Sequence, residues 1–90
     1  MIYTQTDLNK NTFLRHFDSN TQEEDLVWHR DENDRLMIVE ESNGWKFQFD
    51  DELPFTLLEG MFIRIHKMKY HRLIKDNDSG DLFIKIIENF

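Results

Sequence analysis

The sequence predicts a small all-β domain, built as an antiparallel sandwich or barrel. Seven or eight short runs alternate apolar and polar residues, and turn-forming Gly, Asn and Asp residues separate these runs at close spacing. Aromatic residues are plentiful, with eight Phe, two Trp and two Tyr, and a few large side chains can fill a compact β interior. A chain of 90 residues has room for one such core.

The first 25 residues are polar and are expected to form an N-terminal extension that packs on the core. The core itself is expected at residues 26–90, as a single domain. One apolar cluster interrupts the extension at residues 13–17. Its spacing fits one helical turn capped by Asn11 or Thr12, and a strand fits nearly as well.

Alternation and turn residues predict the strands of the core. The cleanest period-two pattern lies at residues 45–50, where aromatic and polar residues alternate without a break. Asn43 and Gly44 suit a tight hairpin because both residues tolerate positive φ. Pro54 suits the start of a short strand, since it cannot donate to a ladder. We expect strands at residues 26–28, 35–41, 45–50, 55–58, 61–66, 70–75 and 81–88.

Composition narrows the classes of function. The formal charge of −7 argues against sequence-independent binding to nucleic acid, which requires clustered Lys and Arg. The chain has no cysteine, so neither a disulfide nor a thiolate zinc site can stabilise it. It shows neither a basic N-terminal region followed by an apolar run nor a span long enough to cross a bilayer. We expect a cytoplasmic protein without a membrane partner.

Three residues are candidate metal ligands. In a strand, side chains alternate between faces, so His29 and Asp31 point the same way. His71, on a distant strand, can complete a His-x-Asp…His set. Imidazole and carboxylate together suit Fe(II), Mn(II), Ni(II) or Zn(II), so the sequence predicts a single divalent ion at this place.

The chain resembles small single-domain cupins, the jelly-roll or double-stranded β-helix family, over about residues 26–88. In the first motif of that family, two histidines one residue apart are followed by a glutamate and then a glycine. The corresponding positions here are His29, Asp31, Arg35 and Ser42. The second motif has a glycine, a proline, a second glycine and a histidine. Its positions here are Gly60, His66, Met68 and His71.

The resemblance implies a cupin jelly roll in which His29 and His71 match family metal ligands. Asp31 replaces the second histidine with another competent ligand. Arg35 stands where the family has a ligating glutamate, and a cation cannot bind a metal, which leaves three ligands. The remainder is similar to the facial triad of the oxoglutarate-dependent oxygenases. Whether the protein is an enzyme stays open; an enzyme of this type would be a metal-dependent dioxygenase, isomerase or lyase.

A second hypothesis needs no metal. Asp31 and Arg35 can form a buried ion pair beside two hydrogen-bonded histidines, in a non-catalytic ligand-binding or assembly module that has lost its metal. Arg35 could instead bind the carboxylate or phosphate of a small anionic ligand. Gln48 is a further candidate for ligand binding, because it lies on the face of its strand opposite the aromatic residues.

We expect the other histidines and the aromatic residues to lie outside the metal site. His66 is expected at the rim and His16 in solvent. Trp28 and Tyr70 should face away from the pocket if the strands alternate regularly, and the aromatic stripe at residues 45–49 should be core or interface. Because a chain this short buries a limited part of its surface, we expect a homodimer.

Overall fold

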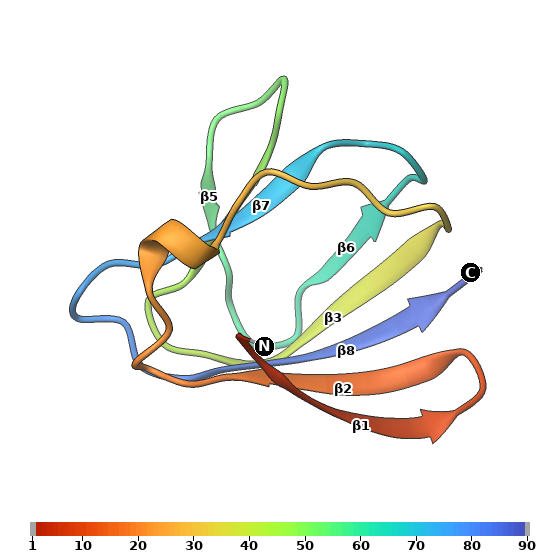
Figure 1. Cartoon of the computed structure of the whole chain (residues 1–90), viewed down its shortest axis with the longest axis horizontal. Helices are drawn as coiled ribbons and strands as arrows, with labels where there is room; N and C mark the ends of the chain where they lie inside the picture. The colour runs from red at the N-terminus through yellow and green to blue at the C-terminus, as the bar shows by residue number, and fades with distance from the viewer. Residues whose placement is uncertain (1, 90) are drawn as a thin grey trace.

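The computed structural model describes residues 2–89, whose strands form two antiparallel sheets (Figure 1). The larger sheet has five strands in the order β1-β2-β8-β3-β6, and the smaller has three in the order β5-β4-β7. The strands are β1 (Thr4–Asn9), β2 (Thr12–Phe17), β3 (Arg35–Ser42), β4 (Lys46–Phe49), β5 (Phe55–Thr56), β6 (Phe62–Ile65), β7 (His71–Ile74) and β8 (Leu82–Glu88). A short 3-10 helix, η1 (Glu23–Asp25), precedes β3. The predicted all-β jelly-roll fold is confirmed.

The hydrophobic core lies where the two sheets face each other. Alternation along β8 turns Leu82, Ile84 and Ile86 inward, where each is at most 4% exposed. The smaller sheet adds Phe47, which is 1% exposed, and the preceding Trp45 is fully buried. Trp45 donates its indole N–H to the carbonyl of Gly80 at 2.7 Å, so its polar atom is satisfied inside the core. These two members of the aromatic stripe are core residues.

The N-terminal segment is part of the larger sheet. We expected residues 1–25 to pack on the core as an extension, with either a helical turn or a strand at residues 13–17; in the structure, residues 4–9 and 12–17 form β1 and β2. All of β2 pairs with β8, from Thr12 opposite Ile87 to Phe17 opposite Leu82. A strand forms here because β8 offers a backbone partner and alternation turns both phenylalanines of the cluster inward. Met1, at the start of the predicted extension, and Phe90, at the end of the predicted core, lie outside the described residues.

Two other predictions from sequence differ from the structure. Residues 26–28 are not a strand; Val27 and Trp28 are 61% and 41% exposed, so this apolar run is not one face of a sheet. The bend at Asn43 and Gly44 does not close a hairpin, because β3 and β4 belong to different sheets. Gly44, at φ +83°, turns the chain from one sheet to the other.

The remaining predicted strands are confirmed to within a few residues. Pro54 directly precedes β5, as expected. In β6, Ile63 and Ile65 are buried while Phe62 and Arg64 are exposed, which matches the predicted faces. Among residues 2–89, no helix is long and apolar enough to cross a membrane. The cytoplasmic location stays a prediction.

Candidate metal centre

The backbone holds His29 and His71 side by side. The amide of His29 donates to the carbonyl of His71 at 3.0 Å, and the reverse hydrogen bond measures 2.9 Å. The two residues thus form an isolated antiparallel bridge. Directly opposed residues project their side chains to the same face, and the ring centroids are 4.3 Å apart. His71, at the start of β7, is buried, whereas His29 is exposed.

Asp31 completes the group. Its backbone carbonyl accepts a hydrogen bond from the amide of Met68 at 2.7 Å, which fixes the loop before β3 against the loop before β7. Its Oδ2 lies 3.3 Å from His71 Nε2. One potential ligand atom from each of His29, Asp31 and His71 lies within 4.8 Å of the other two. The predicted convergence of these three residues is therefore observed, and metal binding by them stays a prediction.

The tautomers of both histidines can be deduced from backbone carbonyls. His71 Nδ1 lies 2.8 Å from the carbonyl of Lys69, and His29 Nδ1 lies 3.1 Å from the carbonyl of Val27. A carbonyl can only accept, so Nδ1 must carry the hydrogen in each ring. Each neutral imidazole then keeps a lone pair on Nε2. Histidines that bind metals are usually oriented by the same kind of second hydrogen bond.

The carboxylate of Asp31 has one satisfied and one unsatisfied oxygen. Its Oδ1 lies 3.3 Å from Arg35 Nη1. Its Oδ2 is buried and makes no hydrogen bond to any residue from 2 to 89, although His71 Nε2 is close. Two lone pairs face each other at that distance unless a proton or a cation lies between them. The donor set therefore fits a metal ion or, equally, a second ring proton on His71 that would pair with Asp31.

Arg35 lies between two carboxylates. Besides Asp31, it donates from Nε and Nη2 to Glu88 Oε2 at 3.2 and 3.1 Å. The side chains of Arg35 and Asp31 are 14% and 13% exposed, so the ion pair is largely removed from water. The ion pair of the second hypothesis is thus present. It occupies only Oδ1 of Asp31, so it does not compete with a metal for Oδ2.

Burial and the neighbouring residues have opposite effects on the pKa of Asp31. Burial raises the pKa of Asp31, but His71, Arg35 and His29 lower it more, and the net pKa is below the ordinary value. Burial also lowers the pKa of His29, an effect that its bond to the Val27 carbonyl opposes only in part. At neutral pH we therefore expect an ionised Asp31 and a neutral His29, which are the ligating forms.

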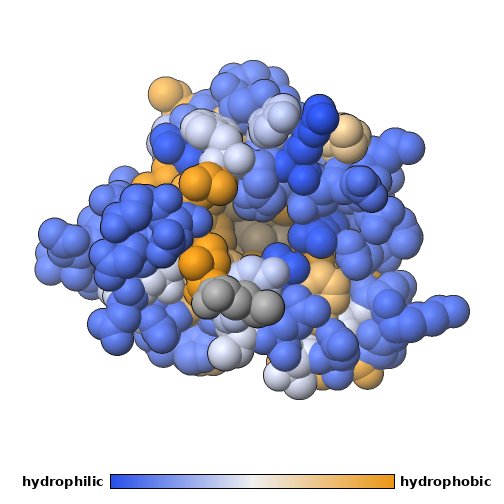
Figure 2. Space-filling view, in the orientation of Figure 1, coloured by the Kyte–Doolittle hydropathy of each residue, from blue (hydrophilic) through white to orange (hydrophobic). Residues whose placement is uncertain are grey.

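A cavity of about 290 Å³ adjoins the three residues. Its walls come from both sheets and are mostly apolar, with Phe17, Met37, Phe47, Ile65 and Ile84 among them. His29, Asp31, His71 and Arg35 line it as well. Seen from the same side as Figure 1, the surface is hollowed near its centre, where hydrophobic residues lie among hydrophilic ones (Figure 2). An apolar pocket with a few convergent polar groups is the usual form of a ligand site.

The sequence analysis missed two charged residues of this cavity, Arg15 and Asp25, and wrongly placed Gln48 in it. Arg15, on β2, lines the cavity. A lone cation between Phe13 and Phe17 on one strand face was the signal, but the segment was interpreted as an extension outside the core. Gln48 does not line the cavity: its Nε2 donates to the Glu52 carbonyl at 3.0 Å, and its Oε1 accepts two hydrogen bonds from Arg72.

The other histidines and aromatics lie outside the cavity. His66 is exposed, as expected. His16 is not simply in solvent, because its ring stacks on Phe83 with centroids 4.2 Å apart and its Nε2 lies 2.9 Å from Asp81. Trp28 and Tyr70 are each 41% exposed, and neither lines the cavity.

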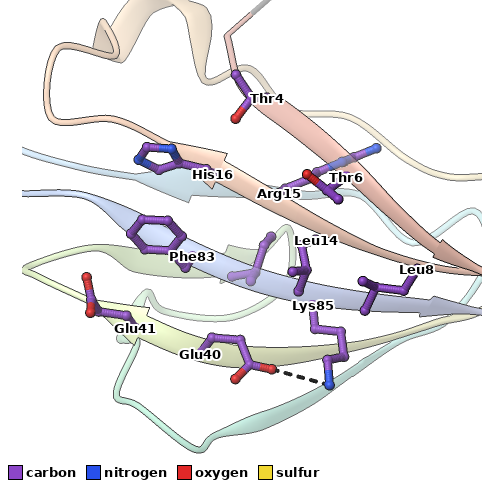
Figure 3. Close-up of a pocket in the computed structure, with 11 residues that line it drawn as sticks. Thr4, Thr6, Leu8, Leu14, Arg15, His16, Glu40, Glu41, Phe83 and Lys85 are labelled. Atoms are coloured by element: carbon purple, nitrogen blue, oxygen red, sulfur yellow. Dashed lines mark ion pairs between the residues drawn. The ribbon is translucent and has the colours of Figure 1, made fainter.

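A second, broader hollow of about 700 Å³ lies on the outer face of the larger sheet (Figure 3). Its floor is formed by Leu14 and Phe83, and one side carries an ion pair between Glu40 and Lys85 at 3.6 Å. None of the predicted metal ligands lines it. The candidate metal centre therefore belongs to the interior cavity.

Comparison with known proteins identifies the fold. No family model and no curated protein sequence matches the chain. A putative mannose-6-phosphate isomerase from Ralstonia eutropha is similar in structure, with a TM-score of 0.71 and 14% identity over 99% of this chain and 84% of that one. A cupin-2 domain protein from Shewanella frigidimarina has a TM-score of 0.65 and 19% identity over 92% and 76%.

A third similar structure is that of FeII HppE, with a TM-score of 0.65 and 10% identity over 86% of this chain and 41% of that one. At such identities the likeness concerns the fold alone. The antiparallel two-sheet architecture and these neighbours together define the protein as one with the cupin fold. It carries a His-Asp-His group that could hold a metal.

Proposed function

We propose that this protein binds one divalent metal ion through His29, Asp31 and His71, beside a pocket that takes a small anionic ligand. The observation that supports the proposal most is the buried, unsatisfied Oδ2 of Asp31, which faces the lone pair of His71 Nε2 at 3.3 Å. A cation between the two atoms would satisfy both. The fold neighbours include one protein named with Fe(II), which agrees with this chemistry.

Two imidazoles and one carboxylate suit Fe(II), Mn(II), Ni(II) and Zn(II) alike, so the proposal covers these four ions. Such an ion would supply Lewis-acid chemistry or, in the case of iron, chemistry with dioxygen. The protein residues around it have separate tasks. Arg35 holds the carboxylate of Asp31 in place, and the carbonyls of Val27 and Lys69 orient the rings. These tasks suit a dioxygenase, an isomerase or a lyase equally.

A non-catalytic module remains the second candidate, because Arg35 already balances charge in the site. Its guanidinium contacts both Asp31 and Glu88, so the carboxylates are neutralised without a metal. In that case the domain would fold equally well in chelator and with metal. Metal-dependent stability therefore separates the two candidates.

The test is thermal unfolding of tag-free protein in chelator and with each of the four metal ions. An ion that binds only the folded state adds RT ln(1 + [L]/Kd), about 2.7 kcal/mol at a hundredfold excess over Kd, and shifts the Tm of a small domain by several degrees. We expect this shift in the wild type and in His66→Ala, whose histidine is exposed and does not line the cavity. His71→Ala and His29→Ala should abolish it.

Two variants are needed because His71 is buried and its removal could impair folding, whereas His29 is exposed. A wild type without any metal-dependent shift would overturn the proposal in favour of the non-catalytic module. Equal shifts in the wild type and in a folded His29→Ala variant would place the metal elsewhere.

A further inference from the structure

The interior cavity has two arginines, and only one of them is fully engaged. Arg35 uses Nε, Nη1 and Nη2 on the carboxylates of Asp31 and Glu88. Among residues 2–89, the hydrogen bond made by Arg15 runs from Nε to Gln5 Oε1 at 3.0 Å. Neither terminal amino group of Arg15 makes a hydrogen bond within residues 2–89, and the residue lines this cavity as well as the outer hollow. Two parallel donors in a plane match a carboxylate.

The guanidinium of Arg15 is held in place by aromatic rings. Its central carbon lies 4.2 Å from the centroid of the Tyr3 ring and 5.0 Å from that of Phe13. Arg35 lies 5.7 Å from the same Phe13 ring, so the two cations are near neighbours. Stacking restricts the planar fork to one orientation, which lowers the entropy lost when it binds an anion.

The surroundings of Arg15 favour an anion. Burial lowers the pKa of Arg15 and so does the nearby Arg35, whereas Tyr3, Asp31 and Glu88 raise it; the net pKa is below the ordinary value. The charged side chains that line the cavity are Arg15, Arg35, Asp25 and Asp31, which cancel formally. Arg35 also pairs with Glu88, just outside the lining, so a divalent ion would leave this group of side chains with a charge of about +1, which a carboxylate ligand would neutralise.

The remaining lining limits the body of the ligand. Leu26, Met37, Ile65, Leu73 and Ile86 are all apolar, so the part of a ligand beyond its charge must be apolar as well. At ~30 Å³ for each small group, as for a water molecule, a cavity of 290 Å³ holds about ten non-hydrogen atoms. That is the size of a short-chain fatty acid or a small aromatic acid.

We propose that the ligand of this cavity is a small monocarboxylate with an apolar body, and that Arg15 binds its carboxylate. This inference rests on the proposed function for the place of the ligand beside His29, Asp31 and His71. It assigns the anion to Arg15 in place of Arg35, whose donors are already taken. Tyr3 and Gln5 act as positioning residues, because they orient the guanidinium of Arg15.

The test measures binding of sodium hexanoate by calorimetry or by NMR shifts, once with Zn(II) and once with chelator. Hexan-1-ol has the same body without the charge, and acetate has the charge without the body. We expect the wild type to bind hexanoate at least about tenfold more tightly than either control compound. Arg15→Gln should weaken hexanoate binding by about tenfold or more, and Arg15→Lys should weaken it less.

The matched control is Arg30→Gln. Arg30 is exposed and also stacks on a tyrosine, Tyr70 at 5.2 Å, but it does not line the cavity. Its hexanoate affinity should equal that of the wild type. The hexanoate affinity of Arg15→Gln is compared with that of the wild type only after its NMR spectrum shows a native fold. If Arg15→Gln does not fold, the affinity of Arg15→Lys is compared in its place.

The outcomes separate this inference from the metal proposal. Equal hexanoate affinity in the wild type and in a folded Arg15 variant would overturn the inference, as would a wild type that binds hexanoate in neither arm. Neither result bears on the metal-dependent shift in Tm, which tests the proposed function separately. Hexanoate binding that depends on Arg15 in chelator, with no metal shift, supports the inference while the metal proposal fails.

Discussion

Asp31 uses its two carboxylate oxygens for different purposes. Oδ1 contacts Arg35 at 3.3 Å, and Oδ2 faces His71 without a hydrogen bond. The spacing His29-x-Asp31 and the distant His71 predicted the cluster from sequence, but not through the expected strand: His29 and Asp31 lie in the loop before β3, and an isolated bridge from His29 to His71 brings the group together. Glu88 and Arg15 could not be predicted in the same way. Their contacts depend on the register of β8 against its neighbours, which sequence patterns do not specify.

The first prediction concerns Arg35. Replacing it by Met leaves the carboxylates of Asp31 and Glu88 without a cation in a largely buried place. Breaking a fully buried pair costs about 3–5 kcal/mol, and partial exposure here reduces the expected loss to about 2 kcal/mol. Urea unfolding in chelator measures it, with Arg30→Met as the surface control. A loss equal to that of the control would contradict the assigned network.

The second prediction concerns pH and Asp81. The hydrogen bond from His16, together with that from the Ser19 amide, lowers the pKa of Asp81 below its ordinary value of 3.8. The unfolded chain then binds the proton more tightly, so the stabilisation is present above pH 3.8 and is lost as the pH falls through the folded pKa. We expect an NMR titration to place the carboxyl midpoint below 3.8, and His16→Phe to raise it. A wild-type midpoint at or above 3.8 would refute the assignment.

At the scale of the elements, strands with a complete period-two pattern were predictable and short or edge segments were not. β4, β6 and β8 follow the apolar alternation of their residues, because each has one face in the core. Residues 26–28 have apolar character but are too few and too exposed to pair as a strand. The first strand, β1, was missed because it is exposed along its whole length and carries no alternating signal, whereas a strand at residues 13–17 was one of two alternatives.

The third prediction concerns the turn before β7. Met68 has φ 65°, in the left-handed region. It stands at the position where the second cupin motif has its second glycine. A side chain there is strained, and Met68 is 46% exposed, so little packing is lost when it is removed. We expect Met68→Gly to raise the free energy of unfolding by about 0.5–1 kcal/mol. The matched control is Lys67→Gly, at ordinary φ, which should lower it. Destabilisation by Met68→Gly would contradict the claim of strain.

At the scale of the whole molecule, the fourth prediction is a homodimer. The aromatic stripe does not supply the interface, because Trp45 and Phe47 are in the core. The outer face of the larger sheet is a better candidate, with Phe62 and Leu8 exposed by 70% and 51%. We expect sedimentation equilibrium at micromolar concentrations to show a dimer, and Phe62→Lys to weaken it. A wild type that stays monomeric over this range would exclude the dimer.

The cupin fold serves here to bring residues from distant parts of the chain to one cavity. His29 and Asp31 come from the loop before β3, His71 from β7 and Arg15 from β2. Fold likeness alone does not assign an activity, so the account depends on the chemistry of these four side chains. Its central claim is that the first three hold a metal.

Metal content is the most direct measurement of that claim. Tag-free protein is loaded with each candidate ion, freed of unbound metal by gel filtration and analysed by mass spectrometry of the elements. The account predicts close to one ion per chain for at least one of Fe(II), Mn(II), Ni(II) and Zn(II), with little metal left in His29→Ala and full content in His66→Ala. A folded wild type that retains none of the four ions would contradict it.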